Sequence, residues 1–321
     1  MYEFKIKIQK NSFIWNKFIL NSSSPNIFNH SFFLDIYDVD KYFIYKNDEV
    51  FGAFSLNRNN ELKIEKHNEL LYTPIVYKSF LGKPFSSILN EKFLITQEVC
   101  NYLYNNEKSG EIIFDHYTED LRPFFWKNFD SKCDFFSVSD IKYTSIINID
   151  MIDHINLEQS IFFKNFSRRT RQSYRYSINK SNYEIEEYFD VELIKELITE
   201  TFHRQDLKIN FNLDKHIEIL KKLKNNNLLK SFICREGQEI KAIAIFGVND
   251  NTATLINAAK RGDASDNHSL LYLYLKSFIE LKNIKIDFID LEGMNSPKRS
   301  FFKNGFGGYL KAYYTIKFNT K

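Results

Sequence analysis

The chain has 321 residues, of which 43% are hydrophobic and 26% charged, and its formal net charge is +3. This balance is typical of a folded globular protein and excludes a disordered chain. The small net charge excludes a general electrostatic coat for nucleic acid, so we expect no DNA partner. The 32 Phe and 19 Tyr residues are explained by AT-rich codon usage, and by themselves they indicate no binding surface.

The cysteines and the N-terminus bear on the compartment. Cys100, Cys133 and Cys234 are far apart and odd in number, so they predict neither a disulfide framework nor a metal-binding pair. The first residues, MYEFKIKIQK, alternate charge and hydrophobe, unlike a signal peptide. No run approaches the roughly 18 apolar residues of a membrane span. We therefore expect a cytoplasmic protein in a reducing compartment, which contacts a membrane at its surface at most.

The first half of the chain reads as a three-stranded meander, a helix, a strand, a short element and a long strand. Alternating hydrophobicity predicts the strands of the meander at YFIYK, VFGAFSLN and ELKIEKH. Residues 85–105 predict a helix, and EIIFDHY predicts a strand after it. RPFFWKNF forms the short element, and FFSVSDIKYTSIINI the long strand.

The second half begins with helices and then repeats this order. Residues 157–180, 191–202 and 213–224 have helical spacing. LLKSFICRE and IKAIAIFGV predict a hairpin around Gly237, and TATLINAAK predicts a third strand. A helix over 267–283, capped near Asn267 or Ser269, leads to the apolar strand IKIDFIDLEG. Pro297 opens the short helix PKRSFFKNGF, and GYLKAYYTIKF is the last strand.

The repeated order indicates an internal duplication. FFWKNF, at 124–129, follows one predicted strand, and FFKNGF, at 301–306, follows the corresponding strand of the second half. Chance similarity in a chain rich in Phe, Asn and Lys is the alternative. We expect an α/β protein of two halves, residues 1–152 and 153–321, with mixed sheets flanked by helices.

The most prominent polar feature is the basic segment SIFFKNFSRRTRQSYRYSINK. If this segment is one helix, Lys164, Arg168, Arg171 and Arg175 share one face. Like charges at this spacing repel, and a bound diphosphate or CoA would relieve the repulsion. The alternative is a solvated basic face balanced by acidic residues elsewhere in the fold.

Three further groups are candidates for chemistry. Asp290 and Glu292 lie two apart at a predicted strand end, so they should point to the same side, where either carboxylate could accept a proton from an amine. Lys303 precedes a glycine-rich turn and could stabilise an oxyanion, although an exposed helix lysine is the default. His203 and Arg204 place a base beside a cation, with a helix-end surface position as the alternative. No spacing of His, Cys and Asp predicts a metal site, and we expect no metal.

The second half resembles the FemAB-like, or BioF2-like, acetyltransferase domain of the GNAT superfamily. The resemblance runs through RRTRQSYRYSINK, TFHRQ, SFICREGQEIKAIAIFG, NHSLLYLYLKSFIE and DFIDLEGMNSPKRSFFKNGFGG. The first half also fits, through FDHYTEDLRPFFW and KYTSIINID, so the resemblance covers nearly the whole chain. It implies two tandem GNAT-like halves.

Fem proteins are peptidoglycan-bridge aminoacyltransferases that use aminoacyl-tRNA, and a Phe-Lys pair near their C-terminal end contributes to the transfer site. Phe302 and Lys303 match this pair, which makes Lys303 the leading catalytic candidate and implies that it stabilises charge on the reacting carbonyl. The glycine-rich pyrophosphate turn of acetyl-CoA-binding GNAT enzymes and the coiled-coil arm of some Fem members are absent from the sequence. The acyl donor, acyl-CoA or aminoacyl-tRNA, therefore stays open.

The sequence and the resemblance together predict an acyltransferase. The acceptor would be an amine of a nucleotide- or lipid-linked envelope precursor, either an amino sugar or a peptidoglycan peptide. Lys303, Asp290 and Glu292 are the predicted catalytic residues, and the predicted binding residues are Phe302, Arg168, Arg171, Arg175 and Arg204. A GNAT-fold module that binds nucleotide-linked ligands without catalysis is the alternative.

Overall fold

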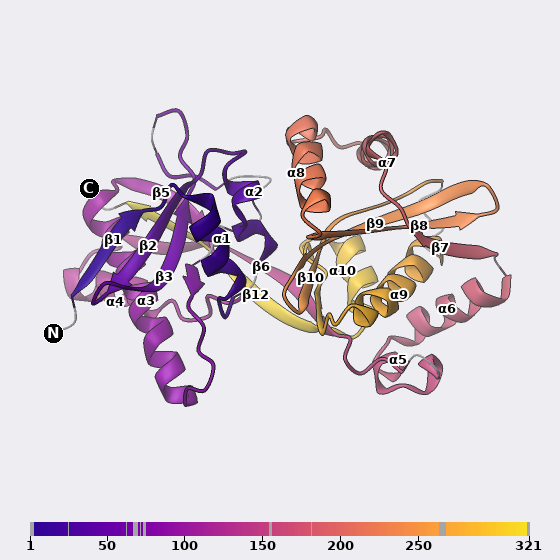
Figure 1. Cartoon of the computed structure of the whole chain (residues 1–321), viewed down its shortest axis with the longest axis horizontal. Coiled ribbons are helices and arrows are strands. Elements are labelled where there is room, and N and C mark those ends of the chain that lie inside the picture. Colours follow the sequence, from indigo (N-terminus) through magenta and orange to yellow (C-terminus); the bar gives the residue numbers. More distant parts are fainter. Residues whose placement is uncertain are drawn as a thin grey trace. The chain divides into compact units, whose positions relative to one another are not determined.

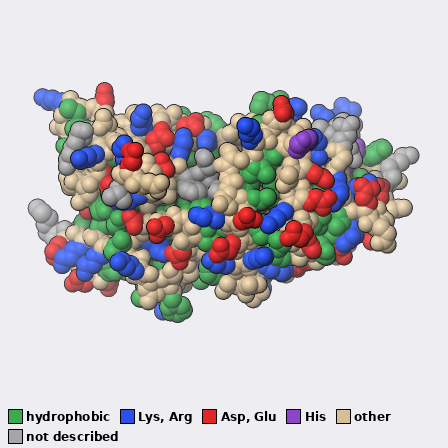
Figure 2. Space-filling model, turned by 90° about the horizontal axis from the view of Figure 1, so that it is seen from above, with side chains coloured by type: hydrophobic (Ala, Val, Ile, Leu, Met, Phe, Trp, Pro, Cys, Tyr) green, Lys and Arg blue, Asp and Glu red, His purple; other side chains and the backbone are tan. Residues whose placement is uncertain are grey.

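The computed structural model describes residues 3–24, 26–61, 63–66, 70, 72, 75–153, 156–180, 182–262 and 268–319. The chain forms two compact units (Figure 1). Unit 1 consists of Met1–Lys142 together with Ala312–Lys321, and unit 2 is Tyr143–Lys311. On the face drawn in Figure 2, Lys and Arg side chains are interspersed with Asp and Glu, as the small net charge leads one to expect.

Unit 1 contains a four-stranded antiparallel sheet in the order β1-β2-β3-β4. In chain order its elements are β1 (Phe4–Ile8), α1 (Ser12–Leu20), η1 (Ile27–Asn29), α2 (Ser31–Leu34), β2 (Asp40–Lys46), β3 (Glu49–Leu56), β4 (Ile75–Tyr77), α3 (Phe85–Asn106), β5 (Ser109–Ile113), α4 (Arg122–Ser131) and β6 (Phe136–Asn148). The strand β5 pairs antiparallel with β12 (Tyr309–Asn319), the last strand of the chain.

The side chains of β2 alternate between two apolar layers, as expected for a strand buried on both faces. Phe43 stacks on Trp15 of α1, with ring centroids 5.6 Å apart. Tyr42 and Ile44 lie in the cluster that includes Ile95 of α3. Both faces of the sheet are thus covered by helices.

Unit 2 contains η2 (Leu157–Gln159), α5 (Ile161–Lys164), α6 (Arg168–Lys180), β7 (Tyr183–Glu187), α7 (Val191–Arg204), α8 (Leu213–Asn225), β8 (Leu229–Glu236), β9 (Glu239–Asn249), β10 (Thr252–Lys260), α9 (His268–Asn283), β11 (Phe288–Asp290) and α10 (Pro297–Asn304). Its strands follow the order β6-β11-β10-β9-β8-β7, and β11 is parallel to β10. The antiparallel pairs are β11 with β6, β10 with β9, β9 with β8 and β8 with β7.

Helices cover both faces of this sheet. Figure 1 shows α7 and α8 on one side of it and α6 and α9 on the other. The core on the α9 side joins Ala242, Ala244 and Phe246 of β9 to Phe278 of α9. Because side chains alternate along a strand, Ile243 and Ile245, both buried, face the α7 and α8 side. The expected α/β fold with mixed sheets flanked by helices is confirmed.

The order of elements occurs twice along the chain. β1, two α-helices, β2-β3-β4, α3, β5, α4 and β6 are matched in turn by β7, two α-helices, β8-β9-β10, α9, β11, α10 and β12. Each series ends on a strand that pairs in the other unit, since β12 pairs with β5 and the end of β6 pairs with β11. The compact units therefore differ from the expected halves 1–152 and 153–321: the division falls at Lys142, and the last ten residues belong to unit 1.

Two of the expected elements differ in the structure. ELKIEKH is no strand of the first meander within the described residues; only Ile64 takes part, through isolated bridges to Arg58 and Gly110, and β4 is the third strand. The segment 157–180 is not one helix, because it divides into η2, α5 and α6. The physical reason is a second helix start: the Ser167 hydroxyl accepts a hydrogen bond from the backbone N–H of Thr170 at 3.1 Å.

Candidate active site

The sheet of unit 2 opens where β10 and β11 end. These two strands pair over only three positions, the last being Thr254 with Asp290. Beyond it β10 continues beside β9 as far as Lys260, with a bulge between Leu255 and Asn257. After Asp290 the chain separates from β10 but stays beside β6, because the backbone N–H groups of Leu291 and Met294 donate to the carbonyl oxygens of Ser145 at 2.9 Å and Tyr143 at 3.1 Å. Both strands point their carboxyl ends to this opening, the edge at which open α/β sheets bind their ligands.

Lys303 lies beside the segment that leaves β11. Its side chain is buried, and its Nζ donates hydrogen bonds to the carbonyl oxygens of Leu291 and Glu292, each at 2.6 Å. Burial lowers the pKa of the Lys303 ammonium, an effect that the nearby Glu292 carboxylate partly offsets and the Arg299 guanidinium reinforces. The lysine is therefore no exposed helix residue, because the structure holds a cation in a desolvated place.

Glu292 occupies a turn that L-residues rarely adopt. Its φ is +49°, and the following Gly293 has φ +51°. A left-handed conformation at a non-glycine residue costs about 1–3 kcal/mol and is common at functional sites. Burial raises the pKa of the Glu292 carboxyl, and attraction to Lys303 opposes the rise. The turn thus places a carboxyl that retains its proton more readily next to a lysine that releases its proton more readily.

Asp290 makes contacts different from those of Glu292. Its Oδ1 accepts hydrogen bonds from the Thr144 hydroxyl of β6 and, at 2.8 Å, from the backbone N–H of Glu292. β11 ends at Asp290, so the expectation that both carboxylates share one side of a strand is wrong: Glu292 is no longer in the strand. These bonds favour a role for Asp290 in positioning the turn.

The end of α10 packs closely against the start of α6. A Cβ on Gly305 would lie 2.1 Å from Oγ1 of Thr170, and one on Gly307 would lie 2.4 Å from the carbonyl oxygen of Asn165. The carbonyl of Gly305 accepts a hydrogen bond from the backbone N–H of Ser167 at 2.9 Å. This contact brings the first turn of the basic helix next to the helix that carries Lys303.

The cations of the basic segment differ in the protein groups that their side chains contact. Arg175 pairs with Glu158, with Nη2 at 2.8 Å from the carboxylate, and Arg171 donates to the carbonyl of Lys164 at 2.8 Å. Arg168, at the exposed start of α6, has no protein partner among the described residues. Lys164 lies on the separate α5, so the predicted continuous face of four cations is wrong.

The other two predicted binding residues have partners inside unit 2. Arg204 donates to the carbonyl oxygens of Lys260 at 3.0 Å and Gly262 at 3.2 Å, so it fastens the end of α7 to the end of β10. The ring of Phe302 packs on Tyr274, with centroids 5.5 Å apart. Phe302 therefore orients α10 and, through it, its neighbour Lys303.

Comparison with solved structures shows which proteins share this fold. FemX matches with a TM-score of 0.64 and 11% identity, over 97% of this chain and 96% of FemX. The C-terminal domain of a protein named as a lysylphosphatidylglycerol synthetase, from Agrobacterium fabrum, matches with 0.54 and 10%, over 94% and 89% of the two chains. A tandem GNAT protein from the clavulanic acid biosynthesis pathway matches with 0.52 and 7%, over 99% of each.

The chain has the tandem GNAT fold. No family model matches the sequence, and no curated protein matches it significantly. At such low identities the matches show the fold alone. The resemblance inferred from the sequence is thus confirmed at the level of the fold, and the twice-repeated order of elements is the tandem arrangement.

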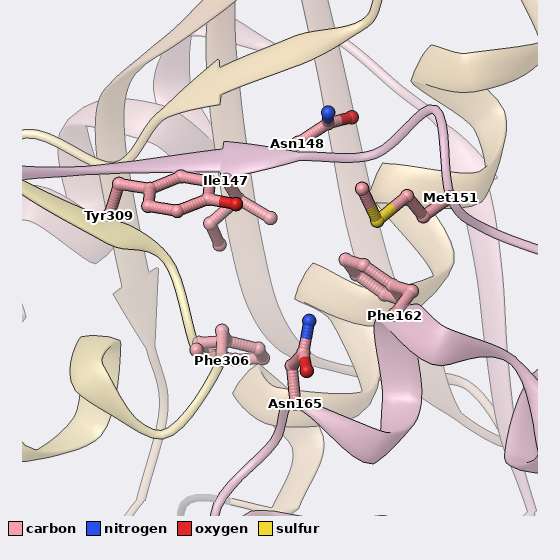
Figure 3. A pocket seen from close by; sticks show the side chains of 8 residues that line it. Ile147, Asn148, Met151, Phe162, Asn165, Phe306 and Tyr309 are labelled. Atoms are coloured by element: carbon pink, nitrogen blue, oxygen red, sulfur yellow. The ribbon is translucent and has the colours of Figure 1, made fainter.

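Within this tandem GNAT fold, one small hollow lies beside the end of β6. It is lined by Ile147, Asn148, Met151, Phe162, Asn165, Phe306, Gly307 and Tyr309, and Figure 3 shows the side chains of both asparagines and of Met151 around it. Its volume is about 20 Å³, enough for a single water molecule. None of the predicted catalytic residues lines it. We therefore base the candidate site on the opening of β10 and β11 and on Lys303, not on this hollow.

A polar pair that the sequence patterns did not indicate lies at the opening. An imidazole nitrogen of His216 on α8 lies 2.6 Å from Oδ1 of Asn257, the first residue of β10 after the bulge. The available signal was an asparagine inside the apolar strand TATLINAAK. Thr144 was missed in the same way, as a hydroxyl in a buried stretch of β6.

The described residues show neither a cluster of metal ligands nor a membrane-spanning helix. Among them, no three or more His, Cys, Asp and Glu side chains are grouped so that they could hold a metal ion. In the same part of the chain, no helix combines the length and apolarity needed to cross a bilayer.

Proposed function

We propose that the protein is an acyltransferase that joins an acyl or aminoacyl group to an amine of a nucleotide- or lipid-linked precursor of the cell envelope. The observation that carries the proposal is the buried Lys303, held by two carbonyl oxygens directly after β11, at the edge where β10 and β11 separate. The tandem GNAT fold supports the reaction class. The name of one structural neighbour, a lysylphosphatidylglycerol synthetase, supports the transfer of an amino acid to a lipid-linked acceptor.

The proposed reaction is attack of the acceptor amine on the activated acyl carbonyl. A new C–N bond forms as the bond from the carbonyl carbon to the donor's sulfur or oxygen breaks. Two of the three N–H groups of Lys303 are taken by Leu291 and Glu292, and the third stabilises the oxyanion. Glu292 accepts the proton that the amine loses and passes it to the departing thiolate or alkoxide of the donor, which leaves as a thiol or an alcohol. Arg168 binds the phosphates of the acceptor or of the donor.

One observation also fits a second candidate function, that of a binding module without catalysis. Both hydrogen bonds of Lys303 go to the protein's own backbone, which is what a structural lysine also does. Lys303→Ala separates the two functions. An acyltransferase should lose about 10²–10³ in kcat with its precursor affinity retained, since a single oxyanion donor is removed. A binding module shows no turnover before or after the substitution.

The donor is tested by mass spectrometry of products. The protein is incubated with acetyl-CoA or with charged tRNA, each in the presence of nucleotide-linked amino sugars and envelope precursors. A mass shift that appears only with charged tRNA supports aminoacyl transfer, and one with acetyl-CoA supports N-acetylation. Binding of a nucleotide-linked precursor without any shift would overturn the catalytic proposal for both donors.

A further inference from the structure

The N-terminal end of α3 and the turn before it carry large apolar side chains in contact with solvent. Leu81 is 94% exposed and Phe85 is 73% exposed, and Leu89 follows one helical turn later. The turn is ordered, because the backbone N–H of Lys83 donates to the carbonyl of Phe80 at 3.1 Å and Phe80 is itself buried. In Figure 1 this end of α3 extends past the strands of unit 1.

The exposed apolar surface continues onto α4. Phe85, Leu89 and Phe93 are spaced four residues apart, so they follow one side of α3. The ring of Phe93 lies 5.1 Å from that of Trp126 on α4, and Phe129, one turn further along α4, is 82% exposed. We call this surface the α3–α4 tip: Leu81, Phe85, Leu89, Phe93, Trp126 and Phe129.

Cations surround the α3–α4 tip. On and before α3, Lys78, Lys83 and Lys92 outnumber Glu91, the single acid between residues 78 and 93, which pairs with both Lys78 at 3.2 Å and Lys83 at 2.6 Å. The guanidinium of Arg122 on α4 lies 5.5 Å from the centroid of the Trp126 ring and pairs with Asp120 at 2.6 Å. Acids therefore offset part of this charge, but over residues 78–93 and 119–132 the six Lys and Arg residues still outnumber the four Asp and Glu residues. The tip thus combines an apolar end with a border of net positive charge.

We propose that the α3–α4 tip docks on the surface of an anionic lipid bilayer. Leu81 and Phe85 would enter the acyl boundary, Trp126 and Phe129 would lie at the level of the headgroups, and the lysines would meet the lipid phosphates. Contiguous exposed apolar surface of this kind marks interaction sites in soluble proteins. The positive border disfavours a second copy of the chain as the occupant, because a symmetric contact would place like charges together.

This proposal rests on the proposed function, because docking on a bilayer would bring the protein to a lipid-linked acceptor, which resides there. The α3–α4 tip lies in unit 1, whereas the candidate active site lies in unit 2. Vesicle binding and acyl transfer to a water-soluble acceptor can therefore be measured separately, and either can fail without the other.

The test is co-sedimentation of the full chain with vesicles, either of phosphatidylcholine alone or of equal parts phosphatidylcholine and phosphatidylglycerol. We expect binding to the anionic vesicles, and a loss of about tenfold or more in Leu81→Ser/Phe85→Ser, which removes the two most deeply inserted groups. The matched control is Phe13→Ser, which changes a phenylalanine 78% exposed on α1 of the same unit and should leave binding unchanged. Equal thermal unfolding of all three proteins excludes a folding defect.

Three results would overturn the proposal. The parent chain fails to bind anionic vesicles, or the double variant binds them as tightly as the parent does. Alternatively, sedimentation velocity shows that the parent is a dimer which Leu81→Ser/Phe85→Ser converts to a monomer, which would assign the tip to a second copy.

Discussion

Substituting Gly305 by alanine should disturb the contact that brings α6 beside α10. The backbone of Gly305, with φ −58° and ψ −22°, suits any residue, so the new Cβ acts through crowding alone. That Cβ would lie 2.1 Å from Oγ1 of Thr170, whereas a carbon and an oxygen in contact lie roughly 3.3–3.6 Å apart. Either the Thr170 side chain must rotate and lose its 2.8 Å hydrogen bond with the Ser167 hydroxyl, or one helix must shift by about 1 Å.

Overpacking of this kind in a close-packed interior costs about 1–3 kcal/mol. We expect Gly305→Ala to lower the free energy of unfolding by this amount. It should also lower activity, because Lys303 lies only two residues earlier and its 2.6 Å hydrogen bonds depend on where α10 ends. The affinity for a nucleotide-linked ligand should change as well if Arg168, at the start of α6, moves with the contact.

The assay is a double-mutant cycle of Gly305→Ala and Thr170→Ala, read by urea unfolding. Thr170→Ala removes the oxygen that the new Cβ meets, so the double variant should be less destabilised than the sum of the single variants by about 1 kcal/mol or more. Costs that add within about 0.5 kcal/mol would refute the crowding argument and with it the close approach of the two helices.

Three further predictions concern titration and ligand affinity. Burial raises the pKa of Asp115 to about 6 from 3.8, so the folded protein holds a proton there that the unfolded chain releases. The free energy of unfolding should therefore fall by on the order of 3 kcal/mol as pH rises from about 4 through 6. Asp115→Asn should flatten this slope when urea unfolding is measured at several pH values. If Glu292 is the base, kcat should rise with pH through its raised pKa and Glu292→Gln should remove that limb, whereas a pH profile unchanged by the substitution would exclude the role. Arg168→Ala should weaken binding of a nucleotide-linked ligand about tenfold, as measured by calorimetry. The control is Arg175→Ala, which breaks a pair with exposed Glu158 and should change this affinity little. A larger loss of affinity in Arg175→Ala than in Arg168→Ala would contradict our assignment of Arg168 as the phosphate-binding cation.

The local period of hydrophobic residues predicts most of the helices and strands of unit 2. TATLINAAK spans the same nine residues as β10, and the helix over 213–224 is α8 with one residue added. Such segments are predictable because each repeats its own period over several residues and has a turn signal at its ends. ELKIEKH alternates equally well, but its described residues, Glu61 and 63–66, form only bridges at Ile64, because alternation records that one face is buried and does not identify the neighbouring strand.

The candidate site was predictable in its residue types and less so in its geometry. PKRSFFKNG reads as a polar surface helix, yet Lys303 is buried, because its acceptors are carbonyl groups that reach it only after β11 ends and the chain turns at Glu292. The break after Lys164 had a local signal, since Ser167 precedes Thr170 by three residues as a capping side chain does. The pair of Arg175 with Glu158 joins residues 17 apart and depends on that break.

The exchange of last strands between the two repeats affects the order in which the two units can fold during synthesis. Unit 1 begins with β1 but is completed by β12, in which Thr315 to Asn319 pair with β5. A domain built from one stretch of chain can finish folding while the ribosome is still synthesising the rest of the polypeptide. Unit 1 must wait with the β5 edge unpaired until β12 has emerged from the ribosome, so unit 2, contiguous from Tyr143 to Lys311, has its full set of strands first.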